Sequence, residues 1–351
     1  MMSEKREQFP DILRIIACVM VVGIHIAMEG WYDTSPRTYT WTVLNFYDTV
    51  FRPAVPLFIM LSGSLFLRKD HLDLRKLWTG SILRIFLIYV FWVVFYAVTN
   101  NGIHKVLGNP ALIRDGILGP NPQYHLWYLR MILNIYAIAP ILWILVSNLD
   151  QKLFGYYFCL FVLFGSVCNT ILDLPFTPQW LHDQLNLFVD MDLVRYSGYF
   201  ILGYWLSVKD PFALFPRKRI LIIYLITVIA AAGLNQWIAA ADDWPTQALY
   251  GNFSLPVLIE SVCIFLLVRS RFSGSSLQDH KAAWLRRVSE STLFVYLIHP
   301  FVIQRIHMYL HFYTIDHNVL FSVPVMIILV FCLSSLIGSL LKKIPIINRF
   351  V

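Results

Sequence analysis

Charged residues are scarce in this chain of 351 residues. Asp, Glu, Lys and Arg make up 14% of the sequence, and hydrophobic residues make up 58%. A soluble globular domain carries about 25% charged residues, so this deficit excludes an ordinary soluble protein. The net charge of +7 is then better explained as a membrane-topology signal than as a nucleic-acid-binding surface.

Close-spaced cysteine pairs are also missing. The five cysteines all lie within apolar segments: Cys18, Cys159, Cys168, Cys263 and Cys332. Such placement favours packing thiols over disulfides or a metal site. The sequence has no P-loop, dinucleotide-binding fingerprint, zinc motif or Gly-x-Ser-x-Gly elbow. We therefore expect no bound metal.

Long apolar runs are abundant. Segments of about 20 apolar residues cross a bilayer as helices, whereas strands of a membrane barrel alternate over about 10 residues. We predict an all-α, polytopic membrane helix bundle of about ten transmembrane helices, forming a single domain over residues 1–351. The first segment is no cleavable signal, because it is long and holds charges. The expected spans are 9–30, 45–67, 78–99, 124–147, 153–172, 190–208, 220–240, 248–268, 288–311 and 319–341.

The basic residues are unevenly distributed between the loops. If the N-terminus is cytoplasmic, 19 of the 28 Lys and Arg residues fall in inside segments and only three fall outside. The positive-inside rule therefore predicts that both termini are cytoplasmic. The outer loops are acidic and aromatic, which fits either plain solvated loops or a surface suited to sugars.

The first span, "PDILRIIACVMVVGIHIAMEG", holds Asp11, Arg14, His25 and Glu29. A charge near the bilayer centre costs roughly 2.5 kcal/mol or more, so four such groups call for an explanation. Arg14 and His25 are 11 residues apart, close to three helical turns, and so share one face about 16 Å apart along the axis. Asp11 and Glu29 have pairing spacing on that face.

This polar stripe has two interpretations. In the plain one, Asp11 and Arg14 form an interfacial ion pair and His25 is a core histidine. In the functional one, His25 is a general base whose ring Glu29 holds, and Arg14 anchors a phosphate. The stripe as a whole favours a long, phosphate-bearing donor threaded through the protein.

At these residues the sequence resembles the acyltransferase-3 family of integral membrane acyltransferases. The family hallmark is an arginine, ten residues and a histidine in the first helix, here Arg14 and His25. Further segments are similar to family motifs in order along nearly the whole chain: "RPAVPLFIMLSGSLFL", "YHLWYLRMILNIYAIAPIL", "GYFILGYWL" and "STLFVYLIHPFVI". One departure is Ser81, which stands where many members carry the first of two arginines; Arg84 supplies the second.

The resemblance implies acetyl-CoA as the acyl donor from the cytoplasm, and a glycan or lipid-linked glycan hydroxyl as the acceptor on the far face. It implies a multi-pass protein of the bacterial inner (plasma) membrane, surrounded by membrane lipids. Arg14, Arg84, Arg75 and Lys76 are then the expected donor-binding residues. Neither the choice between direct transfer and an acetyl-histidine intermediate nor the presence of a homo-oligomer follows from the sequence.

Other polar residues carry alternatives. His125 and Trp127 lie at the outer end of the fourth span, where an interfacial role and acceptor contact are both open; Arg130, just over a turn deeper, favours acceptor binding. His299 precedes Pro300 and either satisfies the carbonyl that this proline frees or lines the donor channel.

Two further sets of residues are expected to be structural. Asp48 and Arg52 have helical pairing spacing and are expected to form a structural ion pair. Ser62 and Gly63 are expected to allow close helix packing.

Three function classes compete. The first is a membrane O-acetyltransferase, and the second is a secondary transporter or flippase for a lipid-linked or acidic substrate. Buried charges and ten helices fit both, but a transporter would more readily show two related halves with broken helices, and no such repeat is visible. The third is a non-catalytic membrane partner of a polysaccharide assembly.

Overall fold

The fold is described from a computed structural model. The structure describes residues 7–119, 123–189, 192–208, 215–273 and 279–343. Every regular element within these ranges is helical. The all-α prediction is therefore confirmed.

The helices follow one another with short connections. The first half of the chain contains α1 (Phe9–Ala27), α2 (Tyr39–Phe51), α3 (Ala54–Phe66), α4 (Leu74–Lys76), the π-helical stretch η1 (Leu77–Ile82), α5 (Leu83–Asn101), α6 (Ile103–Gly108), α7 (Ala111–Leu118), α8 (Trp127–Asn148), α9 (Gln151–Leu160), the π-helical stretch η2 (Phe161–Val167) and α10 (Cys168–Asp173). The second half contains α11 (Gln179–Val189), α12 (Asp192–Val208), α13 (Arg217–Asp242), α14 (Leu255–Phe272), α15 (Asp279–Leu310), the short 3₁₀ turn η3 (Thr314–Asp316) and α16 (Val319–Leu341).

Several helix boundaries have a local cause in the sequence. The side chains of Thr38, Asp150 and Asn318 accept hydrogen bonds from the first free amides of α2, α9 and α16, which is the usual role of an N-cap. Pro53 separates α2 from α3, because a proline within a helix removes a backbone donor. The two helices together still make one membrane-length segment, Tyr39–Phe66.

Eight helical segments of the described residues are long and apolar enough to cross a bilayer. They are Phe9–Ala27, Tyr39–Phe66, Leu74–Asn101, Trp127–Asn148, Gln151–Asp173, Arg217–Asp242, His280–Leu310 and Val319–Leu341. The chain is thus a multi-pass membrane protein. Two more expected spans correspond to α12, which has 17 residues, and to α14, which contains Glu260.

The shorter α14 corrects one expected boundary. The expected span began at residue 248, but α14 begins at Leu255. The preceding residues form a loop, because the Tyr250 hydroxyl and the Ser254 hydroxyl are bound to Thr49 and to the Leu249 carbonyl. Whether α12 and α14 complete ten crossings stays a prediction.

Contacts between segment ends agree with alternating crossings. On the side expected to be cytoplasmic, the contacts are Arg68 with Glu7, Trp143 with Lys69, Arg269 with Ser207 and Lys342 with Glu290. On the opposite side, they are Arg37 with Asp243 and Thr314 with Glu29. Each contact joins ends that the topology assigns to one face. The cytoplasmic location of the termini remains a prediction.

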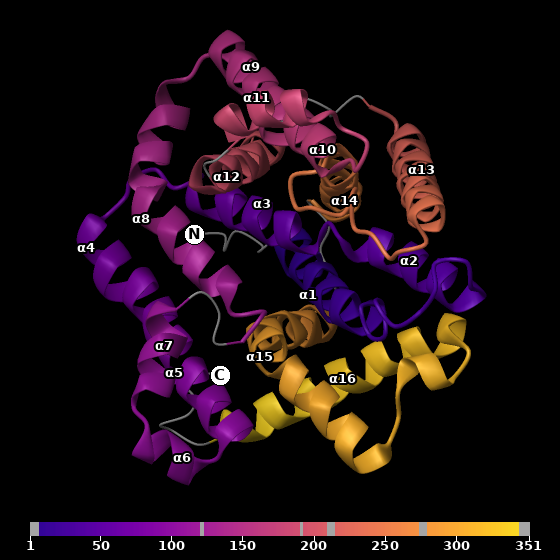
Figure 1. Ribbon diagram of the computed structural model, residues 1–351. Coiled ribbons are helices and arrows are strands. Elements are labelled where there is room, and N and C mark those ends of the chain that lie inside the picture. The colour runs from indigo at the N-terminus through magenta and orange to yellow at the C-terminus, as the bar shows by residue number, and fades with distance from the viewer. Residues whose placement is uncertain (1–6, 120–122, 190–191, 209–214, 274–278, 344–351) are drawn as a thin grey trace.

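The first helix lies in the middle of the bundle. Figure 1 shows α1 between α3 and α15, with α2 and α16 beside it. Outer helices instead expose apolar side chains, among them Leu87 of α5, Ile144 of α8, Ile229 of α13 and Ile328 of α16. Exposed apolar surface of this extent suits contact with lipid chains.

The backbones of α3 and α12 are in direct contact. A Cβ atom on Gly63 would lie 1.8 Å from the Phe200 carbonyl oxygen, and one on Gly203 would lie 1.9 Å from that of Met60. Small residues allow such approach between membrane helices. The expected packing role of Gly63 is therefore confirmed.

We expect the substitution Gly63→Ala to destabilise the protein by about 3 kcal/mol, the upper end of typical overpacking costs, because the added methyl group meets backbone that cannot rotate away. The midpoint of thermal unfolding in detergent measures the effect. The control is Gly155→Ala, because a Cβ atom at Gly155 meets nothing within 4 Å. Equal midpoints for the two variants would contradict the assigned contact.

Candidate active site

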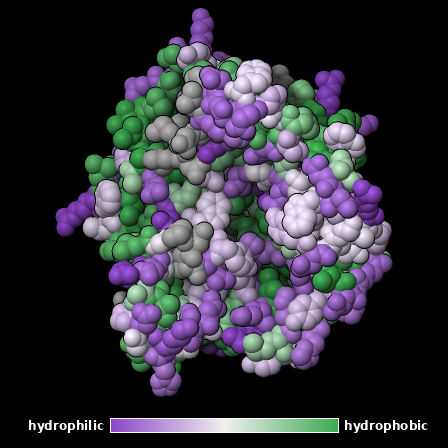
Figure 2. All heavy atoms as spheres, viewed as in Figure 1, coloured by the Kyte–Doolittle hydropathy of each residue, from purple (hydrophilic) through white to green (hydrophobic). Residues whose placement is uncertain are grey.

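A cavity of about 650 Å³ follows the polar face of α1 through the bundle. We call it the main cavity. Its polar lining residues come from segments along most of the chain and include Arg14, His25, Arg52, Ser62, Ser81, Arg84, His125, Asn252, Ser289, Glu290 and Thr292. Figure 2 shows one face of the molecule hollowed near its middle, with hydrophilic residues around the hollow. The main cavity confirms that Arg14 and His25 face a common space.

A three-residue clamp forms the inner end of the main cavity. The Ser289 hydroxyl on α15 donates to Asp11 Oδ1 at 2.8 Å and accepts from Arg14 Nη1 at 3.1 Å. Arg14 also lies 3.6 Å from Asp11 Oδ1. Asp11 is buried, while the Arg14 side chain is 31% exposed. The clamp therefore fixes the guanidinium where it borders the cavity.

The residues at the start of the third crossing also face this space. Ser81 lies in the π-helical stretch and Arg84 in the first turn of α5, and both line the main cavity. The structure thus brings Arg14 and Arg84 together at one cavity, as the sequence led us to expect. It also places Ser81, the departure from the family pattern, beside them.

Two smaller hollows continue from the main cavity toward the 67–76 loop. A hollow of about 210 Å³, the junction hollow, shares Arg14, Ser62 and Ser81 with the main cavity and is also lined by Lys69. A hollow of about 420 Å³, the loop hollow, shares Ser81 and Lys69 with the junction hollow and is lined by Lys76. The three spaces form a series from the loop to the core of the bundle.

The other expected donor-binding residues differ in their positions. Lys76 lines the loop hollow and lies 3.8 Å from Asp73. Arg75 belongs to the short helix α4, and its carbonyl accepts a hydrogen bond from Thr79. Arg75 is absent from the linings of the main cavity and of the two hollows.

His25 at the outer end of the cavity is packed between aromatic rings. Its ring centroid lies 5.0 Å from that of His299, with the planes stacked at 22°, and 4.8 Å from that of Tyr124. His299 is fully buried on α15. The stack limits rotation of the His25 imidazole, and His25 lines the cavity.

His125 completes a cluster of three histidines. Its centroid lies 5.3 Å from that of His299, and its Nε2 lies 3.2 Å from the Leu297 carbonyl oxygen. His299 Nδ1 lies 2.7 Å from the Tyr296 carbonyl oxygen. Because a carbonyl only accepts, both contacts require a proton on the bound nitrogen. The other ring nitrogens, His125 Nδ1 and His299 Nε2, have no hydrogen-bond partner in the described part of the chain.

Sequence reasoning considered these histidines separately and missed the cluster. Its three members come from α1, from the turn before α8 and from α15. The available signal was depth, because His25 and His125 lie toward the outer ends of their expected spans and His299 lies at the middle of its span. His125 and Trp127 both line the main cavity, so their expected position near an acceptor agrees with the geometry. His299 makes the carbonyl contact that was one of its two alternatives, and it is not among the residues that line the main cavity.

The expected contact between Glu29 and His25 is not the one formed. Glu29 Oε2 accepts from the Thr314 hydroxyl at 2.7 Å, and Glu29 Oε1 accepts from the Thr314 amide at 3.3 Å. Its carboxylate also lies 3.3 Å from His307 Nε2. Glu29 thus fastens the end of α1 to the segment between α15 and α16. The expected helical spacing does not apply, because α1 ends at Ala27 and Glu29 lies in the turn that follows it. Residues from the C-terminal part of the chain bind the carboxylate instead.

The Arg130 side chain also bonds to a neighbouring segment of the chain and not to the main cavity. Its Nη1 donates to the Gly119 carbonyl oxygen at 2.6 Å, beyond the end of α7. Arg130 is not among the residues that line the main cavity. This geometry favours a role in joining α8 to the α7 segment.

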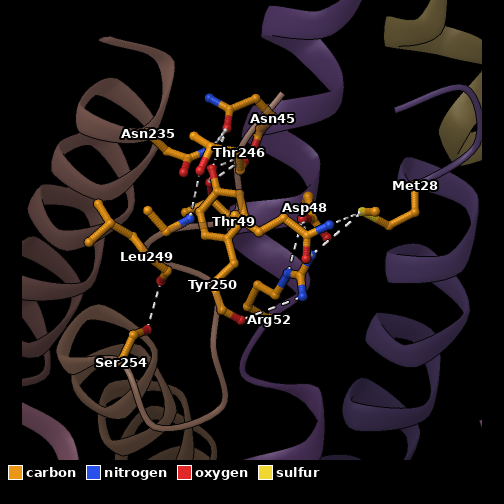
Figure 3. A network of polar contacts seen from close by, with 12 residues as sticks. Met28, Asn45, Asp48, Thr49, Arg52, Asn235, Thr246, Leu249, Tyr250 and Ser254 are labelled. Atoms are coloured by element: carbon orange, nitrogen blue, oxygen red, sulfur yellow. Dashed lines mark hydrogen bonds and ion pairs between the residues drawn. The ribbon is translucent and has the colours of Figure 1, made fainter. Parts of the chain in front are cut away.

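Arg52 is held at the outer end of the cavity by the network in Figure 3. It pairs with the buried carboxylate of Asp48 one turn earlier. It also donates to Gln247 Oε1 at 3.1 Å and to the Tyr250 carbonyl oxygen at 3.5 Å. The expected ion pair is confirmed. Its position beside the cavity was missed, because the residues that complete the network lie almost 200 positions later.

The described side chains offer anion-binding groups but no metal cage. Within these residues, no group of three or more His, Cys, Asp or Glu side chains is arranged to hold a metal ion. The inner end has the guanidinium groups of Arg14 and Arg84, which suit phosphate. The outer end has an imidazole, which suits proton transfer. The cavity can therefore hold a long molecule with an anionic inner end and a reactive outer end.

Comparison with known proteins identifies relatives over nearly the whole length. The family described as "Acyltransferase domain" matches residues 7–343. A probable poly-beta-1,6-N-acetyl-D-glucosamine export protein of Staphylococcus epidermidis is 22% identical over 346 residues, which is 97% of this chain and 92% of that protein. Its counterpart in Staphylococcus aureus (strain MSSA476) is 21% identical over 353 residues, 97% of this chain and 93% of that protein. No solved structure gives a significant match.

The contacts of Glu29 predict that Glu29→Gln lowers the stability of the protein and has only a small effect on turnover. Weakening a charged hydrogen bond costs about 1.5–3 kcal/mol, whereas removing a carboxylate that orients a catalytic histidine lowers turnover by about 10⁴-fold. We expect a lower unfolding midpoint and turnover within about tenfold of wild type. The control is Asp316→Asn, an exposed carboxylate of the same segment. A 10⁴-fold loss of turnover at an unchanged midpoint would instead assign Glu29 to His25.

Proposed function

We propose that this chain, which belongs to the acyltransferase-3 family of membrane acyltransferases, is an O-acetyltransferase. It moves an acetyl group from cytoplasmic acetyl-CoA to a hydroxyl of an extracytoplasmic or lipid-linked glycan. The observation that supports this most is the main cavity, which joins Arg14 and Arg84 at one end to His25 at the other. The family assignment supports acyl transfer in general, and the geometry supports a donor that extends along α1.

The inner groups are suited to the donor. A guanidinium carries a permanent charge and binds phosphate oxygens through paired donors. Arg14 and Arg84 would hold phosphates, with Lys69 and Lys76 beside the two smaller hollows. The distance along α1 from Arg14 to His25, about 16 Å, is then spanned by the thin arm of the donor, which carries the thioester.

The outer groups are suited to proton transfer. In the proposed reaction, His25 removes the proton from the acceptor hydroxyl as its oxygen bonds to the thioester carbonyl carbon. The carbon–sulfur bond breaks, and the thiolate takes up the proton from the imidazolium. His299 and Tyr124 position the ring of His25 by packing, so His299 acts through His25. His125 and Trp127 border the space where the acceptor would approach.

Two likenesses narrow the substrates. The first helix resembles that of the O-acetyltransferase of the enterobacterial common antigen, which supports an acetyl donor. The relatives carry names that refer to a poly-N-acetylglucosamine, which supports a glycan acceptor. Their bacterial sources support a location in the plasma membrane.

Export is the second candidate function. The relatives are named as probable export proteins over 97% of this chain. The series of hollows and the main cavity would also fit passage of a chain through the bundle. The two functions differ in whether acetyl-CoA and His25 are required.

Oriented proteoliposomes test the proposed function. Radiolabelled acetyl-CoA is supplied on the side of the 67–76 loop, and a β-1,6-linked N-acetylglucosamine oligosaccharide on the opposite side. We expect label in the oligosaccharide, with His25→Ala at least about 10²-fold slower because a positioned base contributes about 10²–10⁴-fold. The control is His182→Ala on α11, which is not among the residues lining the main cavity.

Three results would overturn parts of this proposal. The absence of label would refute O-acetyl transfer to this glycan. Label that requires donor and acceptor on the same side would refute a donor extended across the bundle. Oligosaccharide that crosses the vesicle membrane without acetyl-CoA, and equally with His25→Ala, would establish export instead.

Donor binding gives a separate prediction. Arg14→Ala and Arg84→Ala should each weaken acetyl-CoA binding at least about tenfold, because each removes charge-assisted hydrogen bonds. Calorimetry in detergent measures the affinity. The control is Arg114→Ala, an exposed arginine paired with Asp115. The unfolding midpoint of Arg14→Ala is measured in parallel, since this variant also loses the Ser289 contact. Unchanged affinity in both variants would refute the donor site.

A further inference from the structure

A second polar hollow opens beside the outer end of the main cavity. We call it the outer hollow; its volume is about 440 Å³, within the range of about 300–1,000 Å³ for small-molecule sites. Its lining residues come from α2, the end of α10 and the loop before α14: Arg52, Asp173, Thr246, Gln247, Ala248, Tyr250, Gly251 and Asn252. Arg52 and Asn252 line both the outer hollow and the main cavity. A molecule in the outer hollow would therefore lie next to the proposed reaction space.

The loop before α14, which forms most of this hollow, is held by hydrogen bonds to α2 and α13. The Tyr250 hydroxyl lies 2.6 Å from the Thr49 hydroxyl, and it also bonds to the Asn45 side chain. Asn235 on α13 donates to the Thr246 carbonyl oxygen at 3.0 Å. Figure 3 shows the Tyr250 side chain directed between the helices, where it lies with Asn45, Thr49 and Asn235. Because the loop is already ordered, binding a ligand there requires little additional ordering.

The outer end of the loop is fixed as well. The Asn252 carbonyl oxygen accepts from the Tyr199 hydroxyl at 2.7 Å, and Asn252 Nδ2 donates to the Tyr196 hydroxyl at 3.0 Å. The Ser254 hydroxyl donates to the Leu249 carbonyl oxygen at 2.7 Å. The position of Asn252, where the outer hollow meets the main cavity, is thus set by α12.

The charge of the outer hollow disfavours an anionic ligand. The one cation in its lining, Arg52, is neutralised by Asp48. The other charged lining residue is Asp173, whose side chain is exposed. A phosphate or carboxylate would therefore meet a carboxylate and an already compensated guanidinium. The remaining polar groups are the carboxamides of Gln247 and Asn252 and the hydroxyl of Thr246, which bond to uncharged hydroxyl and amide groups.

An aromatic ring lies beside Gln247, one of the lining residues. Gln247 Nε2 donates to the Tyr32 hydroxyl at 3.1 Å, and Tyr32 is 55% exposed. The ring of Tyr32 presents an apolar face beside polar groups, a combination that suits an amphipathic ligand. A sugar has this character, because its ring carries C–H groups on its faces and hydroxyls around its edge.

We propose that the outer hollow binds an uncharged sugar residue of the acceptor glycan and directs one of its hydroxyls toward His25. This assignment rests on the proposed function for its reaction, but binding of the sugar does not require that function. Asp173, Gln247 and Asn252 hydrogen-bond the sugar, and Arg52 stands at the passage to the main cavity. The specificity for the acceptor is then set by the loop before α14, apart from the donor site near Arg14.

Gly251 permits a direct test. A Cβ atom on Gly251 would meet only Asp173 Oδ2, at 3.0 Å, and its backbone is not left-handed. A larger side chain there fills the outer hollow without meeting the packed bundle. The matched control is Gly233 on α13, where a Cβ atom meets nothing within 4 Å and the residue is exposed.

The experiment measures binding of a β-1,6-linked N-acetylglucosamine oligosaccharide to the purified full-length chain by calorimetry, with acetyl-CoA binding measured in parallel. We expect Gly251→Leu and Asp173→Asn to weaken oligosaccharide binding at least about tenfold, as expected for loss of one or two hydrogen bonds. Acetyl-CoA affinity stays at the wild-type value in both. Gly233→Leu and Asp183→Asn, an exposed carboxylate on α11, retain wild-type affinity for both ligands.

The outcomes separate this proposal from the proposed function. Oligosaccharide binding that is lost in Gly251→Leu, in a protein that transfers no acetyl group, supports the outer hollow and refutes the transferase. Transfer with an unchanged KM for the oligosaccharide in Gly251→Leu overturns the outer hollow and leaves the transferase intact. Absence of oligosaccharide binding by wild type also overturns the outer hollow. An anionic glycan that competes with equal affinity overturns the preference for an uncharged sugar.

Discussion

The structure depends on keeping charged side chains inside an apolar bundle. No water is present in the hydrocarbon core to solvate them, so each must bind another group or border a hydrated space. At the inner end of α1, the Ser289 hydroxyl bonds to both Asp11 and Arg14. At the outer end, Glu29 is bound by Thr314. Both ends of α1 are thereby joined to residues more than 270 positions later, which forces α1 and α15 to run side by side.

The same constraint explains where the cavity lies. The inner and outer polar contacts leave the face of α1 between them directed at the space shared with α3, α5, α8 and α15. The close contact of Gly63 with Phe200 sets the position of α3 against α12. A larger residue at this crossing would move α3, whose Ser62 borders the cavity. The packing of small residues and the bonding of charges thus define one space together.

The sequence was most informative where both partners of an interaction lie on one helix. The shared face of Arg14 and His25 and the pair of Asp48 with Arg52 followed from helical spacing, and the structure confirms both. Spacing failed for Glu29, because α1 ends before it and because its partner Thr314 comes from a distant segment. Propensity and periodicity describe one element at a time and contain no information on which helices meet.

Ser289 and the histidine cluster show this limit most clearly. A serine within a helix is an ordinary residue, and only the approach of α15 to α1 turns it into the group that bridges Asp11 and Arg14. His25, His125 and His299 are 100 or more positions apart along the chain, yet their rings are packed together. The loop before α14 was missed for a related reason. Its apolar residues extended the hydrophobic run, while the buried hydroxyl of Tyr250 holds it out of the helix.

Under the proposed function, the arrangement separates the groups for the reaction from the groups for recognition of the acceptor. The stripe of Arg14 and His25 lies on α1. Contacts of α1 with α2, α3, α15 and α16 restrict the substitutions that this helix can accept. The outer hollow is built mainly from a loop, and loops accept substitution more readily than packed helices. Arg52 connects the two, because its charge is bound by Asp48 within the bundle while its guanidinium also bonds to Gln247 in the loop. A change in the loop can therefore alter the acceptor that is bound without moving the histidine. The outer loop is accordingly the part of the site where we expect proteins that share only 21–22% identity over almost the whole chain to differ most.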